Sequence, residues 1–507
     1  MFIRKNKNRS GSFSIQIISK ESGKYKIYKT IGSGKTDQEI EFLYQRANLE
    51  LQALNQTTSM FIDRNDTYLS SFLNSLNNTQ IQVIGPELIF GKIYDAIGFN
   101  QIDNDIFRHL VITRLFQPGS KLKTLDYMDR FLNINKSIDE IYRFLDKLNT
   151  ELKSEVEQIA FEHSRKVLGG TISIVFYDMT TLHFEASDED DLRRTGFSKV
   201  GKHQNPQIYL GLLVGLQGFA IGYDIFEGNI FEGHTLLPMI QKFEERYDLN
   251  KPIIVADAGL LSKDNIAMLE SQGYQYIIGA RIKNESQKIK KRIFEEQWKN
   301  GHLLNIKKDE QQRIVVSYSD KRAKKDSYNR KRGLARLEKS IKRGNLTKSN
   351  INNRGYNKYL RIVGEVKIEI DYSKFEKDAQ WDGLKGYISN SKLKPEQIIE
   401  NYNNLWQIER AFRISKTDLQ IRPIYHRLRN RIEGHICISF TAYCIYKELD
   451  RILKKEKSYL SVKRAADLTH NMYQLNVVLP ESKHLKSILL NMSQEQSDLY
   501  KIILKYF

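Results

Sequence analysis

The sequence predicts an α/β protein in which a mixed sheet flanked by helices is interrupted by a basic, β-rich insertion and preceded by a mostly helical domain. Two observations carry this prediction. Three apolar runs follow one another between Thr171 and Asn229, and their β-branched and aromatic residues are typical of buried strands. A strand, helix and strand pattern then covers Lys251 to Arg281, and helical periods lie before and after these segments.

The residues before the sheet are expected to form two parts. Residues 13–32 hold two short β-branched runs around a Ser-Gly turn, which predicts a hairpin. From about Gln38 to Gly169 the apolar spacing is helical, which favours a plain scaffold, a DNA-end-binding module or a dimerisation module. The predicted parts are an N-terminal β-ribbon at 1–35, a helical domain at 36–169, a first part of the core at 170–280, the basic insertion at 281–394, a second part of the core at 395–455 and C-terminal helices at 456–507.

Two acidic residues are predicted to end buried strands. The run TISIVFYD ends on Asp178, and the next two runs are separated only by a Gln217-Gly218 turn, so three consecutive antiparallel strands are expected. The later run KPIIVAD ends on Asp257, before a turn and a helix. Because open α/β sheets bind ligands at the carboxyl ends of their strands, both acids are candidate site residues.

A third acid, Glu409, lies in the segment YNNLWQIERAFRISK. Pro395 is expected to begin one helix that runs through this segment. Residues three, four and seven apart share a helix face, so Glu409 would lie in a stripe with Tyr402, Leu405, Phe412, Arg413 and Lys416. The alternative for the segment taken alone is a solvated amphipathic helix with Glu and Arg pairs.

The rest of the second half is expected to contain strands in RIVGEVKIEIDY and a strand pair around Asp382-Gly383. A long apolar helix is predicted at about Arg431 to Leu453, followed by a short strand in LNVVLP and by C-terminal helices.

These positions converge in a ribonuclease H-like topology. There, the strand with Asp257 pairs beside the strand with Asp178, and the helix with Glu409 crosses the same edge. Three carboxylates suit Mg²⁺, a hard cation that prefers oxygen ligands, and a pair of such ions supports phosphodiester cleavage. Asp178, Asp257 and Glu409 are therefore a candidate acid triad for a catalytic Mg²⁺ site.

The charge balance predicts a polyanionic partner. The chain has 80 Lys and Arg against 61 Asp and Glu, a net charge of +19. A membrane surface is the less favoured alternative, because there is neither an 18-residue apolar run nor a basic amphipathic anchor.

Residues 321–360 hold 14 Lys and Arg against Asp326 and Glu338, a balance of 14 − 2 = +12. Either this stretch binds DNA or it is a solvated basic helix and loop. Its candidate DNA-binding residues are Lys324, Lys325, Arg330, Lys331 and Arg332.

Two features favour a cytoplasmic protein associated with chromosomal DNA. Cys437 and Cys444 lie seven residues apart on one face of an apolar helix and are expected to be core residues in a reducing compartment. The basic N-terminus lacks the continuous apolar core of a signal peptide.

Several motifs resemble those of DDE-type insertion-sequence transposases, specifically the group with a β-rich insertion and a Tyr-Arg-Glu-Lys signature. The segments YDMTTLHFE around Asp178, IIVADAGLLS around Asp257 and EGN at Glu227 to Asn229 are similar to family motifs. The signature spacing of two, three and six intervening residues falls here on Tyr402, Leu405, Glu409 and Lys416. The resemblance covers roughly residues 170–450.

The resemblance implies a function and a set of partners. Asp178, Asp257 and Glu409 would bind Mg²⁺, as two ions, with Mn²⁺ as a substitute. Tyr402 and Lys416 would contact phosphates of double-stranded DNA at the element's terminal inverted repeats, and the chain would act on DNA as a homodimer. The reaction would be hydrolysis at the element's ends and then attack of the freed 3′-hydroxyl on target DNA. Some relatives form a DNA hairpin, and Trp381 and Trp406 are candidates for stacking on a displaced base. The alternative is that both tryptophans are core residues.

One departure from the signature is Leu405, which stands where the family has Arg. Arg413, one turn beyond Glu409, is the candidate for the missing cation. Two other functions stay open. One is a metal-dependent DNA nuclease that does not join ends, and the other is a domesticated DNA-binding protein without catalytic activity.

Overall fold

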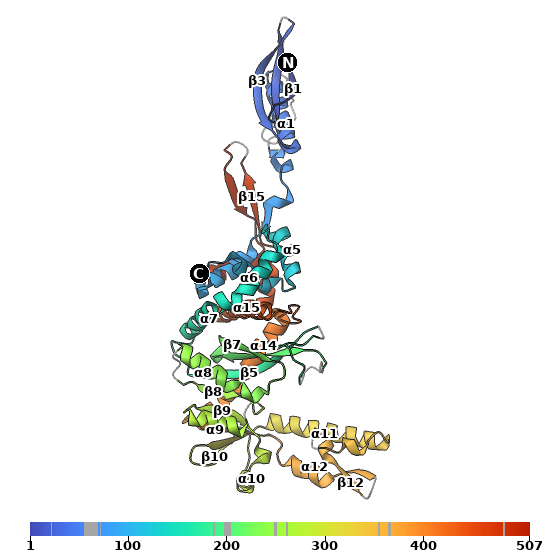
Figure 1. Ribbon diagram of the computed structural model, residues 1–507, viewed down its shortest axis with the longest axis vertical. Coiled ribbons are helices and arrows are strands. Elements are labelled where there is room, and N and C mark those ends of the chain that lie inside the picture. Colours follow the sequence, from blue (N-terminus) through green and yellow to red (C-terminus); the bar gives the residue numbers. More distant parts are fainter. Residues whose placement is uncertain are drawn as a thin grey trace. The chain divides into compact units, whose positions relative to one another are not determined.

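The computed structural model describes residues 1–21, 23–54, 69–70, 72–185, 188–196, 204–247, 251–259, 262–352, 355–363, 367–479 and 482–507. The chain divides into two compact units. The smaller unit consists of Met1–Ile89, Leu125–Lys136 and Arg464–Lys505, and the larger of Phe90–Thr124, Ser137–Lys463 and Tyr506–Phe507. Figure 1 labels their elements. No helix in these described ranges is both long and apolar enough to cross a membrane.

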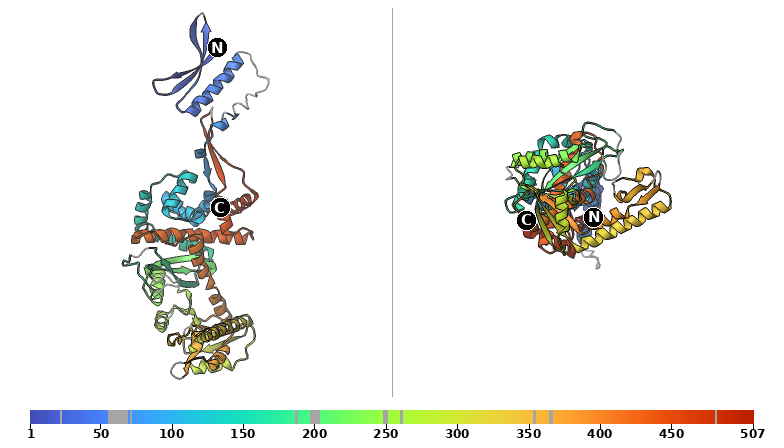
Figure 2. Two further views of the ribbon diagram at one scale, coloured as in Figure 1. Left: turned by 90° about the vertical axis from the view of Figure 1, so that its right-hand side faces the viewer. Right: turned by 90° about the horizontal axis from the view of Figure 1, so that it is seen from below.

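The smaller unit begins with an antiparallel sheet in the order β1-β2-β3, formed by Phe2–Lys7, Phe13–Glu21 and Lys24–Gly34. Helix α1 (Asp37–Leu54) packs on β2 and β3, as Figure 2 shows. Their contact buries Ile15 and Ile17 of the sheet against Ile40 and Ala47 of the helix. The predicted N-terminal hairpin is therefore confirmed.

A second sheet of this unit joins distant parts of the sequence. Strand β15 (Tyr473–Val478) pairs antiparallel with both β16 (Leu485–Leu489) and β4 (Ile81–Val83). The strand predicted in LNVVLP corresponds to β15, whereas β16 and β4 were not expected. Helices α16 (Val462–Thr469) and α17 (Gln494–Tyr506) lie on either side of β15 and β16 in the sequence.

Helices dominate the first part of the larger unit. Helices α3 (Lys92–Ile97), α4 (Asp105–Phe116), α6 (Ile138–Glu151) and α7 (Lys153–Val167) pack against the long helix α15 (Arg429–Lys455). Helix α5 (Lys121–Leu132) follows α4, and its residues from Leu125 on belong to the smaller unit. The predicted long apolar helix is α15, and Cys437 and Cys444 are buried in it as reduced core residues.

An eight-stranded mixed sheet forms the centre of the larger unit, in the order β10-β11-β14-β9-β8-β5-β6-β7. Strand β5 pairs antiparallel with β6 and parallel with β8, β6 pairs antiparallel with β7, and β8 pairs parallel with β9. The strands are β5 (Ile174–His183), β6 (Gln207–Val214), β7 (Ala220–Glu227), β8 (Ile253–Ala256), β9 (Tyr276–Ala280), β10 (Leu303–Lys307), β11 (Arg313–Tyr318) and β14 (Leu384–Ser389). The three predicted antiparallel strands and the strand, helix and strand unit after them are confirmed.

The two faces of this sheet are covered by different helices. Alternate strand residues such as Tyr177 and Tyr209 form one core with α8 (Leu236–Tyr247) and α9 (Lys263–Ser271), which Figure 1 draws in green beside β8 and β9. The opposite face carries Leu210 and Leu212, which meet Phe412 of α14 (Trp406–Arg413) and Phe440 of α15. Successive side chains of a strand point to opposite faces of the sheet, so the strands contribute to two separate cores.

The predicted insertion contributes both to this sheet and to a small separate core. Its strands β10, β11 and β14 extend the sheet beyond β9. Helix α11 (Asp320–Lys342), β12 (Leu360–Val363), β13 (Lys367–Ile370) and α12 (Tyr372–Ala379) pack together around Leu337, Tyr359 and Phe375. They form the yellow and orange group in Figure 1. Helix α10 (Gln287–Phe294) precedes β10.

Three local predictions are wrong. Strand β5 does not end at Asp178 but continues to His183, because its antiparallel pairing with β6 outlasts its pairing with β8. The strand pair around Asp382-Gly383 is instead α12 followed by β14. The single helix from Pro395 to Lys416 is broken into α13 (Pro395–Asn403), α14 and the π-helical turn η9 (Ile414–Asp418).

Candidate functional site

Asp178 and Asp257 lie on neighbouring parallel strands at matching heights. In the β5–β8 pairing, Ile174 is opposite Ile253 and Phe176 is opposite Val255. Extending that register by two residues sets Asp178 opposite Asp257. Asp257 is the residue directly after β8. Strands in a sheet lie about 4.8 Å apart, so the two carboxylates belong to the same edge.

The side chain of Asp178 lies on the sheet face that carries α14. Its neighbours Tyr177 and Met179 point the other way, where both contact Thr235 just before α8. Asp178 and Thr180 therefore share the opposite face. Lys416, in η9, donates a hydrogen bond to the Thr180 hydroxyl, which brings the turn after α14 next to this part of β5.

Asp257 is held by two hydrogen bonds. Its Oδ1 accepts the backbone N–H of Ala258 at 2.7 Å and the hydroxyl of Tyr402 at 3.2 Å. Tyr402 is only 7% exposed, and its ring packs edge-on against Tyr387 with the centroids 4.9 Å apart. Burial and the Asp257 charge raise the pKa of Tyr402, so it is a neutral donor at physiological pH.

Glu409 lies exposed on α14, close to the same group of residues. The carboxylates of Asp257 and Glu409 both favour the charged form of Lys385, and both raise the pKa of Tyr402. Lys385 lies over the Tyr402 ring, 4.5 Å from its centroid. Burial lowers the pKa of Lys385, as does the charge of Arg322 in the first turn of α11, while the two carboxylates oppose this change. Asp257, Glu409, Tyr402 and Lys385 thus form one electrostatic neighbourhood.

The chemistry of these acids fits a hard divalent cation. Carboxylate oxygens are the ligands that Mg²⁺ prefers, and neither Asp257 nor Glu409 forms an ion pair with any residue that the structure describes. Across the same described ranges, however, no three His, Cys, Asp or Glu side chains stand close enough together to hold an ion as one group. The fold places Asp178 and Asp257 on one edge and Glu409 on the helix facing it, without closing them into a single ligand set.

The other two signature positions differ in environment. Lys416 contacts Thr180, whereas Leu405 is the residue at the start of α14 and is partly buried. Arg413 is exposed in the last turn of α14, and no ion pair to a described residue holds it. The helix break between Tyr402 and Trp406 means that the predicted stripe is not one helix face.

Residues 321–342 of the basic stretch lie in α11, and most of the cations of this helix face solvent. Lys324, Lys325, Lys331 and Arg332 are exposed. The helix has ten Lys and Arg against Asp320, Asp326 and Glu338, which gives 10 − 3 = +7. One end of this positive surface reaches the candidate site, because Arg322 acts on the pKa of both Lys385 and Tyr387.

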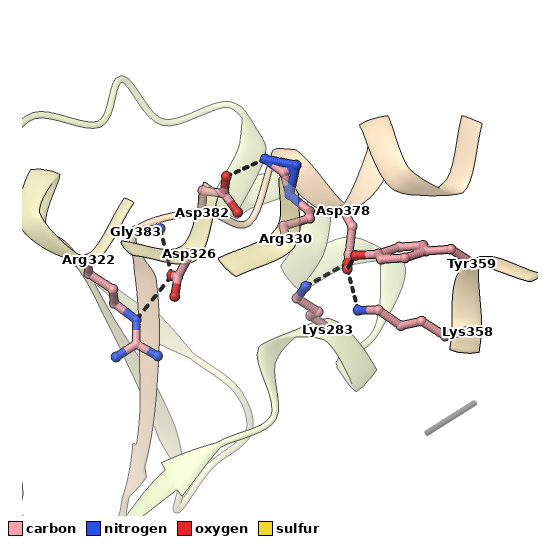
Figure 3. Close-up of polar contacts among 9 residues, drawn as sticks. All are labelled: Lys283, Arg322, Asp326, Arg330, Lys358, Tyr359, Asp378, Asp382 and Gly383. Atoms are coloured by element: carbon pink, nitrogen blue, oxygen red, sulfur yellow. Dashed lines mark hydrogen bonds and ion pairs between the residues drawn. The ribbon is translucent and has the colours of Figure 1, made fainter. Parts of the chain in front are cut away.

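Arg330 differs from the other residues predicted to bind DNA. It is 9% exposed, pairs with Asp382 at 2.5 Å and stacks on Phe375 at 4.8 Å, as Figure 3 shows for the ion pair. These contacts attach α11 to the turn before β14. Because its guanidinium is engaged inside the insertion, we no longer place Arg330 on a DNA-binding surface.

Further polar contacts in Figure 3 fix the same region. Asp378 accepts hydrogen bonds from Lys283 and Tyr359, each at 2.6 Å, and from Lys358. Burial alone would raise the pKa of Asp378, but these donors hold it well below its usual range. Asp326 accepts the N–H of Gly383 at 3.2 Å, next to Arg322. The insertion is therefore an ordered support for the basic helix.

The two tryptophan candidates have different surroundings. Trp381 packs edge-on against Phe294, with the centroids 4.6 Å apart, and borders the main core. Trp406 is 51% exposed at the start of α14. Trp406 is therefore the more exposed of the two candidates for stacking on a base.

Two residues of this neighbourhood were not predicted from the sequence. Lys385 lies in a strand whose partners were unknown, so nothing in the sequence connected it to Asp257. Gly279 of β9 lies under Tyr402, where an added Cβ would be 2.5 Å from the Tyr402 hydroxyl. A Gly in the middle of the run YIIGA is a signal of close backbone approach that could have been used.

Comparison with known proteins identifies the part of the chain that carries this site. A family model described as "Transposase DDE domain" matches residues 169–445, which include Asp178, Asp257 and Glu409. The transposase for insertion sequence element IS231E from Bacillus thuringiensis subsp. finitimus is 24% identical over 278 residues. That alignment covers 50% of this chain and 52% of the relative, so the chain matches about half of the relative's length.

Solved structures that the chain is similar to are also transposases. The piggyBac transposase synaptic complex with hairpin DNA gives a TM-score of 0.37 at 10% identity, over 86% of this chain and 77% of that one. The Mos1 transposase paired-end complex with the left transposon end gives a TM-score of 0.16 at 11% identity, over 48% and 77%.

Proposed function

The chain belongs to the family of transposases with a DDE domain, and from this premise we propose that it cuts DNA at the ends of an insertion sequence and joins them to target DNA. The observation that carries the proposal is the register that sets Asp178 opposite Asp257, on the face covered by the helix with Glu409. We interpret the strand order β9-β8-β5-β6-β7 as a ribonuclease H-like core, with two parallel strands beside an antiparallel meander.

In this proposal Asp178, Asp257 and Glu409 hold two Mg²⁺ ions, with Mn²⁺ able to replace them. When bound, the metal activates the attacking oxygen and stabilises the leaving oxygen during phosphodiester cleavage. The three acids come from β5, the end of β8 and α14. Because Glu409 is on a different layer from the two aspartates, binding of metal and DNA would have to bring it closer to them.

The chain's other residues position the acids and the DNA. Tyr402 fixes the Asp257 carboxylate through its hydrogen bond. Lys416 and the exposed Arg413 are on the segment next to β5, where they would meet phosphates. The exposed cations of α11, Lys324, Lys325, Lys331 and Arg332, would attract and hold the duplex at longer range.

The proposed substrate is double-stranded DNA that contains the element's terminal inverted repeats, and the proposed working form is a homodimer on that DNA. A cut-and-paste reaction needs hydrolysis and strand transfer in the same active site. The alternatives are a nuclease that does not join ends and a DNA-binding protein without catalysis.

One experiment separates these possibilities. The purified chain is incubated with Mg²⁺, a supercoiled target plasmid and a labelled duplex that carries the inverted repeat found beside its coding region. A transposase gives both a cut at the repeat and a labelled plasmid. Cutting without labelled plasmid supports the nuclease, and tight binding without cutting supports the non-catalytic protein.

A further inference from the structure

A cavity of about 500 Å³ in the larger unit is lined by basic residues. It lies among the loop after α4, the first turn of α5, and the segment that leads from η9 to α15. The basic groups that line it are Arg114, Lys121, Lys123, Arg422, His426 and His435, and the phenols of Tyr142 and Tyr425 line it as well. No Asp or Glu is present among the described residues that line it.

Two of these cations are almost fully withdrawn from water. Arg114 is 4% exposed and Lys121 is 5% exposed. Arg114 donates to the carbonyls of Leu419 and Gln420, each at 3.3 Å. Lys121 makes no hydrogen bond or ion pair with any residue that the structure describes, and a buried ammonium without a partner is rare in folded proteins.

The surrounding groups provide no counter-charge. The nearest carboxylate that acts on this cluster, Asp146, is already paired with Arg431 at 2.7 Å. Burial lowers the pKa of Lys121 well below its usual value, and the charge of Arg114 lowers it further. Burial together with Lys121 and Arg114 also keeps His426 and His435 neutral. The lining that the structure describes therefore offers Arg114 and Lys121 no carboxylate partner, and an anion in the cavity would favour the charged form of Lys121.

The backbone at the same place favours an anion. Helix α5 has 12 residues and begins at Lys121. The Ser120 hydroxyl accepts the N–H of Lys123 at 3.2 Å, and Lys121 and Leu122 supply the other N–H groups of the first turn, which have no partner within the helix. The positive end of the helix dipole thus adds to the charge of Lys121 and Arg114.

We propose that this cavity is a binding site for a phosphate group, with Lys121 as the principal charged ligand and Arg114, Arg422 and the first turn of α5 around it. A phosphate oxygen satisfies the Lys121 ammonium and supplies the negative charge that the lining lacks. The segment from Lys416 to Arg422 connects the cavity to the candidate site, and the six steps between these two residues span at most about 20 Å. The phosphate is either a free ion or part of a DNA strand, and only the DNA source rests on the proposed function.

The test measures phosphate binding by the full-length chain, without any DNA reaction. Inorganic phosphate is titrated by isothermal calorimetry, and thermal unfolding is compared in phosphate and in chloride at equal ionic strength. The parent should bind phosphate at one site and unfold at a higher temperature in phosphate. Lys121→Met should weaken binding by about tenfold or more, because it removes the charged ligand. Lys166→Met, which removes an exposed lysine of α7 outside the cavity, should bind like the parent.

Folding of the variant is checked in the same measurements. Since Lys121 is a buried, unpaired charge, Lys121→Met should unfold in chloride at a temperature no lower than the parent. Lys121→Gln serves as a second variant with a polar side chain. If the parent shows no phosphate-specific binding, or if both Lys121 variants bind phosphate as tightly as Lys166→Met, the site assignment is wrong.

A competition experiment then identifies the source of the phosphate. If inorganic phosphate, at constant ionic strength, weakens binding of a DNA duplex to the parent but not to Lys121→Met, the cavity binds a phosphate of DNA. If phosphate binds without affecting DNA affinity, the cavity binds a free phosphate ion. Both results support the site, and neither depends on whether the chain cuts DNA.

Discussion

The hydroxyl of Tyr402 donates a hydrogen bond of 3.2 Å to Oδ1 of Asp257, which connects the end of α13 with the residue after β8. Tyr402 was predicted to contact DNA phosphates, and that role stays a prediction. The structure adds a second one, because a buried tyrosine that binds a candidate metal ligand also fixes the orientation of that ligand.

Tyr402→Phe tests this positioning role. The variant loses the hydrogen bond but keeps the ring that packs on Tyr387. We expect Mg²⁺-dependent cleavage to fall by about 10- to 100-fold, the usual cost of losing such a partner, while DNA affinity stays the same. Tyr459→Phe, at an exposed tyrosine, is the control. Equal cleavage by Tyr402→Phe and the parent would remove this role.

Gly279→Ala should disturb the hydrogen bond between Tyr402 and Asp257, because Gly279 lies against the Tyr402 ring. Its new Cβ would lie 2.5 Å from the Tyr402 hydroxyl and 3.2 Å from Cζ, so the tyrosine has to move. We expect reduced cleavage and reduced stability. Adding Gly279→Ala to Tyr402→Phe should cost less than adding it to the parent, because the closest atom is then absent. Additive effects on cleavage and on urea unfolding would contradict this coupling.

The exposed cations of α11 should determine the salt dependence of DNA binding. Each phosphate contact contributes about 0.9 to the slope of log affinity against log salt, so replacing Lys324, Lys325, Lys331 and Arg332 with Ala should reduce the slope by up to about 3.6. Fluorescence anisotropy at several salt concentrations measures this slope. An unchanged slope would show that α11 does not contact DNA phosphates.

Arg330→Met provides the matched contrast on the same helix. Because Arg330 is buried and paired with Asp382, removing it leaves the partly buried Asp382 carboxylate without that partner, which should cost about 1 to 3 kcal/mol of stability in the insertion. The salt slope of DNA binding should stay the same as in the parent. A reduced slope without loss of stability would return Arg330 to the DNA-binding surface.

The buried histidines predict a loss of stability in mild acid. Burial, aided by Lys121, Arg431 and Arg114, lowers the pKa of His426 from 6.5 to about 4. Between these values the unfolded chain binds a proton that the folded chain does not, so the free energy of unfolding decreases as the pH falls from 6.5 to 4. The shift corresponds to at most about 3 kcal/mol from this residue. His426→Asn should lose less stability than the parent across this range in urea titrations. Parallel curves for the two proteins would contradict the assignment.

The central sheet was predictable because its signals are local and strong. The runs that form β5, β6 and β7 are almost wholly apolar and are joined by short connections, so both their type and their pairing follow from the sequence. The pattern around Asp257 likewise contains a strand, a turn and a helix in one continuous segment.

The errors arose where distant residues decide the outcome. The length of β5 beyond Asp178 depends on β6, which pairs Asp178 with Leu212. The break before Trp406, by contrast, falls at Asn403 and Asn404, and asparagine favours caps and turns over helix interiors, a local signal that the helical spacing of the apolar residues outweighed in the prediction. Lys385 reaches the candidate site because β14 pairs with β9 across more than 100 residues of sequence, and no local pattern encodes that pairing.

The most direct measurement is Mg²⁺-dependent cleavage of a labelled inverted-repeat duplex by Asp178→Asn, Asp257→Asn and Glu409→Gln, with Asp264→Asn, at an exposed acid of α9, as the control. Each of the three variants should lose at least about a thousandfold in cleavage rate, while binding DNA without metal as tightly as the parent. Asp264→Asn should cleave normally. If all three variants cut the duplex as fast as the parent, Asp178, Asp257 and Glu409 are not the catalytic site.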